Sequence, residues 1–244
     1  MTRVADNLPE SIEGIINVNA HPIKRAHPLR VAVLASGRGS NLQAIIDAIE
    51  VGTVHATIVA VISNKKDSGA LERARKHGVR DLFVDPKPFA GRPDSREVYD
   101  RELLEQLNKH DVELVLLAGY MKIVTGVLVN AYANRMMNIH PSLLPSFPGL
   151  DVQKKAIEWG CKLAGCTVHF VTEGVDEGPI ILQAAVPILD DDTPEILAAR
   201  ILEQEHKIYP RAVQLFAEGR LRVEGRRVTI DQGTPVGQSI ISAS

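Results

Sequence analysis

The chain has 244 residues, of which 45% are apolar and 24% charged, and these values are ordinary for a globular protein. The net charge of −2 gives no basic footprint for nucleic acid or an anionic membrane, and no apolar run approaches the ~20 residues of a membrane helix. Two cysteines, Cys161 and Cys166, form neither a disulfide framework nor a zinc pattern, so we expect reduced thiols, no metal site and a cytoplasmic location.

The first part of the chain differs from the rest. Residues 1–28 show no stable hydrophobic period and no secretory signal, which predicts an N-terminal tail with a short helix at residues 9–16 as one option. From Leu29 to residue 230 we find no linker, internal repeat or low-complexity tract. We therefore predict one domain over residues 29–230 and a second tail over residues 231–244.

Short apolar runs alternate with helical patterns in the first half of this domain. The runs predict buried strands at residues 29–36, 56–63, 81–85, 112–119 and 135–140. Helices are predicted between them at residues 40–50, 69–78, 94–111 and 125–133. Glu97 follows Asp94 by three residues, which predicts a capping box at the start of the third helix. The most apolar run, residues 112–119, is expected at the centre of the sheet.

The pattern changes after residue 150. A helix at 151–160 precedes two strands, 165–172 and 178–188, whose connection is too short for a crossover helix, so they are predicted to be antiparallel. A long helix at 193–219 should bend at Pro210, and residues 220–231 should form a hairpin. The predicted fold is α/β: one doubly wound, mostly parallel sheet flanked by helices, Rossmann-like in its N-terminal half, with antiparallel strands added in the C-terminal half.

The loop after the first strand is glycine-rich but lacks the dinucleotide fingerprint. Gly37 and Gly39 match the first two positions of G-x-G-x-x-G, whereas Leu42 replaces the third glycine. The second strand ends in Ser63 and Asn64, where a ribose-binding acid would be expected. No G-K-[ST] follows, which excludes a Walker A loop. These departures argue against NAD(P) and ATP sites of the familiar kinds.

The same loop leads directly into a predicted helix, and this position allows two interpretations. Amides at a helix N-terminus and the helix dipole favour an anion, and Ser40 and Asn41 can add side-chain donors. One interpretation is a phosphate monoester bound on the turn Gly39–Ser40–Asn41. The other is a tight turn in which Ser40 or Asn41 only caps the helix.

Asn138 and His140 end the fifth predicted strand. Residues two apart on a strand point to the same side, so an amide and an imidazole would face one cleft at the carboxyl edge of the sheet. Prolines restrict the loop that follows, at positions 141, 145 and 148. The amide can donate hydrogen bonds and the imidazole can carry a proton near neutral pH. The alternative, a structural pair with no chemical role, is common for a lone Asn-x-His.

A carboxylate is needed to orient such a histidine. The loop at residues 171–179 offers Glu173, Asp176 and Glu177. The set suits acyl transfer from a carbonyl to an amine without a covalent intermediate, because no serine elbow or catalytic cysteine is apparent. His169, in the middle of a predicted strand, is interpreted as a satisfied inner residue, and His206 as a helix-face residue.

Several motifs together resemble the phosphoribosylglycinamide formyltransferase family, which is folate-dependent. They are NIHPSLLPSFPG, SGRGSNLQAI, LAGYMKIV, HFVTEGVDEGPIILQ and EQEHKIYP, and the similarity covers about residues 29–223. The resemblance implies the formyltransferase fold, with 10-formyltetrahydrofolate as co-substrate and phosphoribosylglycinamide as acceptor in purine synthesis. It implies small-molecule partners only, without nucleic acid or membrane, and a monomer or homodimer.

The resemblance also assigns roles to residues. It implies that His140 is the general acid, that Asn138 binds the formyl oxygen and that Asp176 supports His140. The substrate-binding set would be Gly39, Ser40, Asn41 and Glu205; the folate-binding set would be Arg96, Met121, Lys122, Ile123, Val124 and Asn138. Lys122 stands where many relatives carry Arg, which keeps the charge and loses the bidentate fork.

Two alternatives follow from the same residues. One is another enzyme that uses formyltetrahydrofolate, either the deformylase or methionyl-tRNA formyltransferase. The former calls for an N-terminal regulatory domain and the latter for a C-terminal nucleic-acid-binding domain, and neither is expected here. The other is a non-catalytic protein that binds phosphoribosyl ligands, which predicts loss of the set Asn138, His140 and Asp176, although all three are present.

Overall fold

The computed structural model describes residues 26–231. The short helix predicted at residues 9–16, most of the N-terminal tail and nearly all of the C-terminal tail lie outside the described residues. Within residues 26–231, regular structure runs from Leu29 to Ile230. No helix of this part of the chain is long and apolar enough to cross a membrane.

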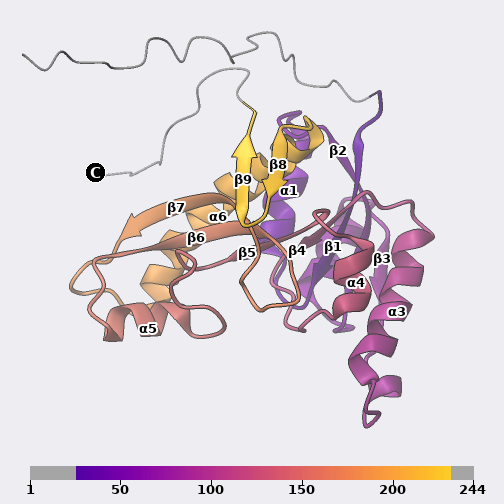
Figure 1. The fold of residues 1–244 in the computed structure, drawn as a ribbon, viewed down its shortest axis with the longest axis horizontal. Helices are drawn as coiled ribbons and strands as arrows, with labels where there is room; N and C mark the ends of the chain where they lie inside the picture. Colours follow the sequence, from indigo (N-terminus) through magenta and orange to yellow (C-terminus); the bar gives the residue numbers. More distant parts are fainter. Residues whose placement is uncertain (1–25, 232–244) are drawn as a thin grey trace, which may run out of the picture.

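A sheet of nine strands forms the centre of the fold, in the order β3-β2-β1-β4-β5-β6-β7-β9-β8 (Figure 1). The strands are β1 Leu29–Ala35, β2 Ala56–Ser63, β3 Asp81–Phe83, β4 Leu114–Leu117, β5 Met136–His140, β6 Leu163–Phe170, β7 Ile180–Pro187, β8 Leu221–Glu224 and β9 Arg227–Ile230. The first five strands pair in parallel, whereas β6 runs antiparallel to both β5 and β7. This confirms the mostly parallel α/β sheet with antiparallel strands added in the second half.

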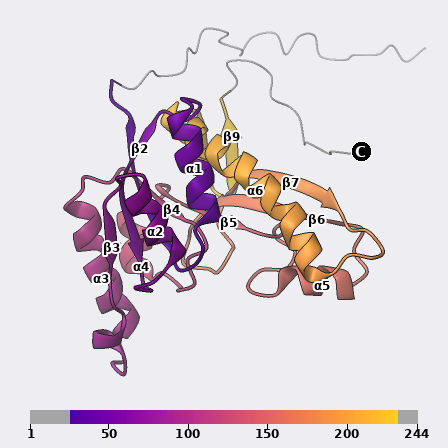
Figure 2. The same cartoon turned by 180° about the vertical axis from the view of Figure 1, so that it is seen from behind.

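Helices cover both faces of the sheet. They are α1 Ser40–Glu50, α2 Gly69–Lys76, α3 Ser95–Asn108, α4 Gly126–Ala131, α5 Val152–Glu158 and α6 Pro194–Ala217, with a short 3-10 helix at Lys87–Phe89. Seen from behind, α1, α2 and α6 lie on one face (Figure 2), and α3 and α4 lie on the other. Because β1 is apolar at every position but one, its alternate side chains enter two separate cores, Val31 and Val33 on one face and Ala32 and Leu34 on the other.

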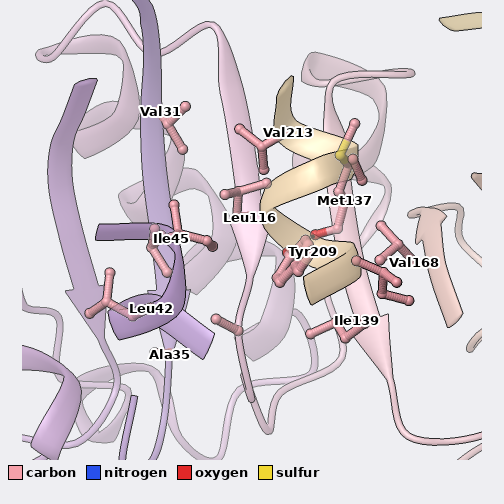
Figure 3. Packing of buried hydrophobic residues seen from close by; sticks show 14 of the residues in the cluster. Val31, Ala35, Leu42, Ile45, Leu116, Met137, Ile139, Val168, Tyr209 and Val213 are labelled. Atoms are coloured by element: carbon pink, nitrogen blue, oxygen red, sulfur yellow. Dashed lines mark hydrogen bonds between the residues drawn. The ribbon is translucent and has the colours of Figure 1, made fainter. Parts of the chain in front are cut away.

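Tyr209 fastens α6 to the middle of the sheet. Its ring is fully buried close to Met137, Ile139 and Val168 (Figure 3). Its hydroxyl donates to the carbonyls of Leu117 and Met137, both at 3.1 Å. These bonds satisfy a buried phenol beside the last residue of β4 and the second residue of β5, so α6 is held against the middle strands of the sheet.

Some local predictions are wrong. Asp94 precedes α3 but makes no cap hydrogen bond, because its carboxylate accepts from Arg92 Nε at 3.0 Å. β4 is the fourth of nine strands, so β5 rather than β4 is the middle strand. Pro210 is buried inside α6, which continues to Ala217, and the predicted bend stays a prediction.

Candidate active site

A cavity of ≈ 420 Å³ opens at the carboxyl ends of β4 and β5. Asn138 and His140 both line it, as expected from their spacing of two on β5. The loop after β6 brings Asp176 to the same cavity, so the structure gathers the three residues that the sequence pointed to. Among the three candidate acids of that loop, Asp176 is the one whose carboxylate reaches His140.

His140 is buried and lies between two oxygen acceptors. Its Nδ1 is 3.3 Å from Asp176 Oδ2, and its Nε2 is 3.0 Å from the carbonyl oxygen of Phe147. Because each ring nitrogen faces an acceptor, the ring can hold a proton on either one. This arrangement suits a group that delivers and recovers a proton.

Two strained residues set these contacts. Phe147 has φ 52° and Asp176 has φ 56°, in the left-handed region that most side chains avoid. Asp tolerates this conformation well, whereas it is unusual for an aromatic residue. The turn at Phe147 directs its carbonyl at His140, and Gly149, two residues later, donates its N–H to Asp176 Oδ2 at 2.9 Å. The backbone of the proline-rich loop thus holds both the imidazole and its carboxylate.

One buried hydroxyl on the neighbouring strand β6 holds the proline-rich loop that follows β5. Thr167 of β6 is fully buried; its Oγ1 donates to the carbonyl of Ser142 at 2.7 Å and accepts from the N–H of Leu144 at 3.0 Å. Gln183 of β7 donates to the same Oγ1 and to the carbonyl of Leu144, both at 2.9 Å. The rigidity expected from the prolines is therefore reinforced by buried hydrogen bonds from two neighbouring strands.

His169 belongs to the site, although the sequence indicated only a satisfied inner residue. It is buried, and its Nδ1 faces the carbonyl of Phe170 at 2.9 Å, while Nε2 lies 3.2 Å from Asn138 Nδ2. Burial lowers the pKa of His169, so the neutral ring with its hydrogen on Nδ1 fits these partners. Nε2 then accepts from the Asn138 amide, whose nitrogen also approaches Asp176 Oδ1 at 3.5 Å.

The expected folate residues divide into two groups. Met121, Lys122, Ile123 and Val124 all line the cavity, on the segment between β4 and α4. Arg96 is exposed at the start of α3 and is not part of the cavity lining. Lys122 directs its Nζ at the ring of Tyr99, 5.2 Å from the centroid, which is a cation–π geometry.

The glycine loop has Gly39 as its essential position. Gly39 is the N-cap of α1 with φ 75°, and a Cβ there would lie 2.8 Å from Ala70 Cα. Only glycine fits both the conformation and this close approach. The loop is held from α2 by Arg73, whose Nε donates to the carbonyl of Arg38 at 3.0 Å. A second cavity, of ≈ 360 Å³, lies beside Ser40 and is lined in part by Arg73 and His206.

Asn41 and Glu205 are joined directly, across 164 residues of sequence. Asn41 Nδ2 donates to Glu205 Oε2 at 2.6 Å, and both side chains are buried. The prediction that Asn41 caps α1 is therefore wrong. Its amide nitrogen donates to a carboxylate of the protein itself rather than pointing towards a bound phosphate. Burial raises the pKa of Glu205, a shift that the Asn41 hydrogen bond and the charge of His140 partly offset. Asn41 Oδ1 is buried without a partner.

We predict that Glu205→Gln stabilises the protein at neutral pH. A raised carboxyl pKa means that the wild type keeps its full stability below the unfolded pKa and loses some as pH rises through the folded pKa. Glutamine is neutral throughout, can still accept from Asn41 and can donate to its unpartnered Oδ1. The melting temperature should rise by about 2–4 °C at pH 7, as roughly 1 kcal/mol gives in a domain of this size.

The gain should vanish near pH 3, well below the ordinary glutamate pKa of 4.5, where the wild-type carboxyl is protonated in both states. Glu203→Gln, an exposed carboxyl on the same helix, is the matched control and should leave the melting temperature unchanged at both pH values. A Glu205→Gln variant that melts below wild type at pH 7 would contradict the assigned cost of this buried charge.

Comparisons with known proteins identify the family of the chain. The family described as formyl transferase matches residues 29–213. Phosphoribosylglycinamide formyltransferase of Escherichia coli (strain K12) is 45% identical over 83% of this chain and 94% of that protein. The trifunctional purine biosynthetic protein adenosine-3 of Drosophila pseudoobscura pseudoobscura is 54% identical over 90% of this chain, which spans only 16% of that longer protein.

Solved structures share the fold. Glycinamide ribonucleotide transformylase 1 from Symbiobacterium toebii superposes with a TM-score of 0.81 at 55% identity, covering 84% of this chain and 95% of that one. A formyltetrahydrofolate deformylase from Pseudomonas syringae pv. tomato is more distant, with a TM-score of 0.77 at 28% identity over 85% of this chain and 67% of that one. On the match to residues 29–213 and these identities, the chain belongs to the formyl transferase family.

Proposed function

We propose that the protein transfers the formyl group of 10-formyltetrahydrofolate to the amine of 5-phosphoribosylglycinamide, in purine biosynthesis in the cytoplasm. The observation that carries the proposal is the single cavity in which Asn138, His140 and Asp176 meet. The E. coli relative, matched over 94% of its length, supports this choice of acceptor.

The reaction begins when the amine lone pair attacks the formyl carbon. The carbonyl oxygen becomes an oxyanion, and Asn138 donates to it through the N–H that otherwise makes the weak 3.5 Å contact with Asp176. His169 accepts the other N–H, which fixes the plane of the amide. Asn138 therefore acts as a donor whose direction is set before substrate arrives.

His140 supplies the proton that the leaving nitrogen needs. As the bond between the formyl carbon and N10 breaks, His140 gives its proton to N10, and the attacking amine loses a proton that restores the imidazole to its charged form. Asp176, at 3.3 Å, stabilises the imidazolium before the proton is given and after it is recovered. The products are the formylated amine and tetrahydrofolate, with no covalent bond to the protein at any stage.

The cavity walls suit a flat, largely apolar ring with a polar edge. Ile123 and Val124 supply apolar surface, and the backbone of the segment Met121–Val124 supplies amides and carbonyls. We place the pterin ring there, with N10 of the folate, which carries the formyl group, towards His140. Arg96 is exposed and lies outside the cavity lining. We assign it to the distal part of the folate, because its positive charge can bind the carboxylates of the folate there.

The phosphate of the acceptor would lie on the turn Gly39–Ser40–Asn41. The first amides of α1 have no carbonyl partner within the helix, and the helix dipole favours an anion there. Arg73 adds positive charge beside Ser40. Glu205, within electrostatic reach of His140, would then contact the ribose or glycinamide part between the phosphate and the reacting amine.

Ser40→Asp tests this placement. The new carboxylate should repel the phosphate and raise the KM of the ribonucleotide by about tenfold or more, while the KM of the folate stays within about twofold. Folding should be preserved, because an acidic residue is favourable in the first turn of a helix. Ser40→Asn is the neutral control. An equal loss of affinity for both substrates would place the phosphate elsewhere.

A hydrolase is the second candidate, because a formyltetrahydrofolate deformylase shares the fold. The discriminating experiment mixes the protein with a 10-formyl folate whose deformylated product absorbs differently, with and without phosphoribosylglycinamide. Signal that requires the ribonucleotide supports the transferase, and signal without it supports the hydrolase. A folded protein that binds the ribonucleotide but gives no signal would indicate a binding protein.

A further inference from the structure

The segment that would contact the folate ring is held at both ends by buried groups outside the cavity. At its first end, the N–H of Met121 donates to Ser36 Oγ at 2.9 Å. Ser36, only 2% exposed at the end of β1, donates in turn to Asn64 Oδ1 at 2.6 Å. The backbone N–H of Ser36 donates to the carbonyl of Gly119 at 3.1 Å, so this end is fastened twice.

At the other end, one carboxylate oxygen takes two hydrogen bonds. Asp100 Oδ2 accepts from the N–H of Thr125 at 2.6 Å and from its hydroxyl at 2.8 Å. Asp100 lies on α3 and is only 3% exposed, and it is not part of the cavity lining. Hydrogen bonds to a buried carboxylate are short and strong, so Asp100 fixes the position of Thr125, where the segment ends and α4 begins.

Between these ends, Val124 is the one buried side chain of the segment Met121–Val124. Met121 is 64% exposed and Ile123 is 54% exposed, so two of the apolar groups expected against the folate are open to solvent. Lys122 leans over the Tyr99 ring on α3. Val124 packs into the hydrophobic core on the α3 face, so the position of the preceding residues, Met121 to Ile123, depends on the two end anchors and on α3.

We propose that Asp100, together with the pair Ser36 and Asn64, positions the segment Met121–Val124 to receive the folate ring. These are positioning residues, because they act through the segment and do not touch the ligand. The proposal rests on the assignment of the cavity to a formyl folate. It predicts that losing either end anchor weakens folate binding while the ribonucleotide site and the chemistry at His140 are kept.

The test compares variants by their two KM values. Asp100→Ala removes both anchors of Thr125 and should raise the KM of the formyl folate about tenfold, with kcat and the ribonucleotide KM within about twofold. Asp100→Asn keeps one oxygen acceptor and should recover much of this loss. Thr125→Val is nearly isosteric and keeps the N–H anchor, but it loses the hydroxyl bonds to Asp100 and to the N–H of Val127, and it should fall between them. The remote control is Thr193→Ala, because Thr193 Oγ1 caps α6 by accepting from the N–H of Ile196.

The control separates a positioning effect from general destabilisation. Thr193→Ala should lower the melting temperature without changing either KM. The proposal is overturned if Asp100→Ala and Thr125→Val change the folate KM no more than this control does, or if both KM values and kcat change together.

Calorimetric titration with the formyl folate keeps the test independent of turnover. If the wild type binds the folate but transfers nothing, the proposed function fails, and the dissociation constants of the Asp100 variants still decide the inference. If the wild type does not bind the folate at all, both proposals are overturned.

Discussion

Replacing His140 by alanine should lower turnover by about 10²- to 10⁴-fold, the range that positioned acid–base groups contribute. The His140 imidazole lies between Asp176 Oδ2 and the carbonyl of Phe147, whereas the second imidazole of the cavity, His169, is engaged by Phe170 and Asn138. Alanine leaves both oxygens beside the cavity, where water can reach them. Binding of the folate should therefore change by less than about tenfold, and the fold should be retained.

Single-turnover kinetics and equilibrium binding measure the two quantities separately. His55→Ala, which removes an exposed histidine far along the chain from the site, is the matched control and should be silent in both. Near-normal turnover of the His140→Ala variant would remove His140 as the acid. A parallel collapse of circular dichroism would indicate a structural role instead.

Asp176→Asn should lower turnover by at least about 10²-fold. Asparagine has the shape of aspartate and tolerates the positive φ of 56° at this position, so the backbone of the loop can stay in place. The substitution removes the negative charge that lies 3.3 Å from His140 Nδ1 and leaves one oxygen on the side chain. In the wild type, Oδ2 accepts from the N–H of Gly149 and faces the imidazole. The amide oxygen can still accept from Gly149 and from the imidazole, but the amide nitrogen then replaces Oδ1 and faces Asn138 Nδ2, which is also a donor.

Glu173→Gln is the control for Asp176→Asn, because Glu173 lines the same cavity from the same loop. It should keep turnover within about threefold of wild type, since no contact joins it to His140. Equal effects of the two variants would mean that the general negative charge of the loop matters, rather than the contact with His140. Asp176→Asn with near wild-type turnover would contradict the role of Asp176.

The period of two along β5 was enough to predict that Asn138 and His140 face one cavity. The identity of the third residue was not predictable in this way, because three acids lie in the loop at 171–179 and spacing does not separate them. Asp176 came from the family resemblance, and the structure supplies its reason. A left-handed backbone at Asp176 and the N–H of Gly149 bring that carboxylate to His140.

His169 was missed because its role depends on strand register. Antiparallel pairing places His169 opposite Asn138 and Thr167 opposite His140, and no local pattern gives that register. The link between Asn41 and Glu205 was out of reach for the same reason, since it joins residues 164 apart. The alternation of Thr167 and His169 on β6 was the available signal, and it predicts only that they share a face.

The turn at Gly39, by contrast, was predicted correctly from the local sequence. The two glycines predicted a tight turn correctly, but only the packing of α2 against the loop explains why a Cβ is excluded at Gly39. The predicted capping box at Asp94 failed because a neighbouring guanidinium, Arg92, competes for the carboxylate. Local motifs are reliable where no other group, near or far in the sequence, competes for the same partner.

The most direct test of the account follows the formyl carbon itself. The protein is mixed with 10-formyltetrahydrofolate labelled at the formyl carbon and with phosphoribosylglycinamide, and the reaction is quenched within one turnover. Direct attack by the amine predicts that the label moves from the folate to the ribonucleotide amine, with none bound to the protein and little released as formate. Label that appears chiefly as formate, or on a protein side chain, would contradict direct transfer through Asn138, His140 and Asp176.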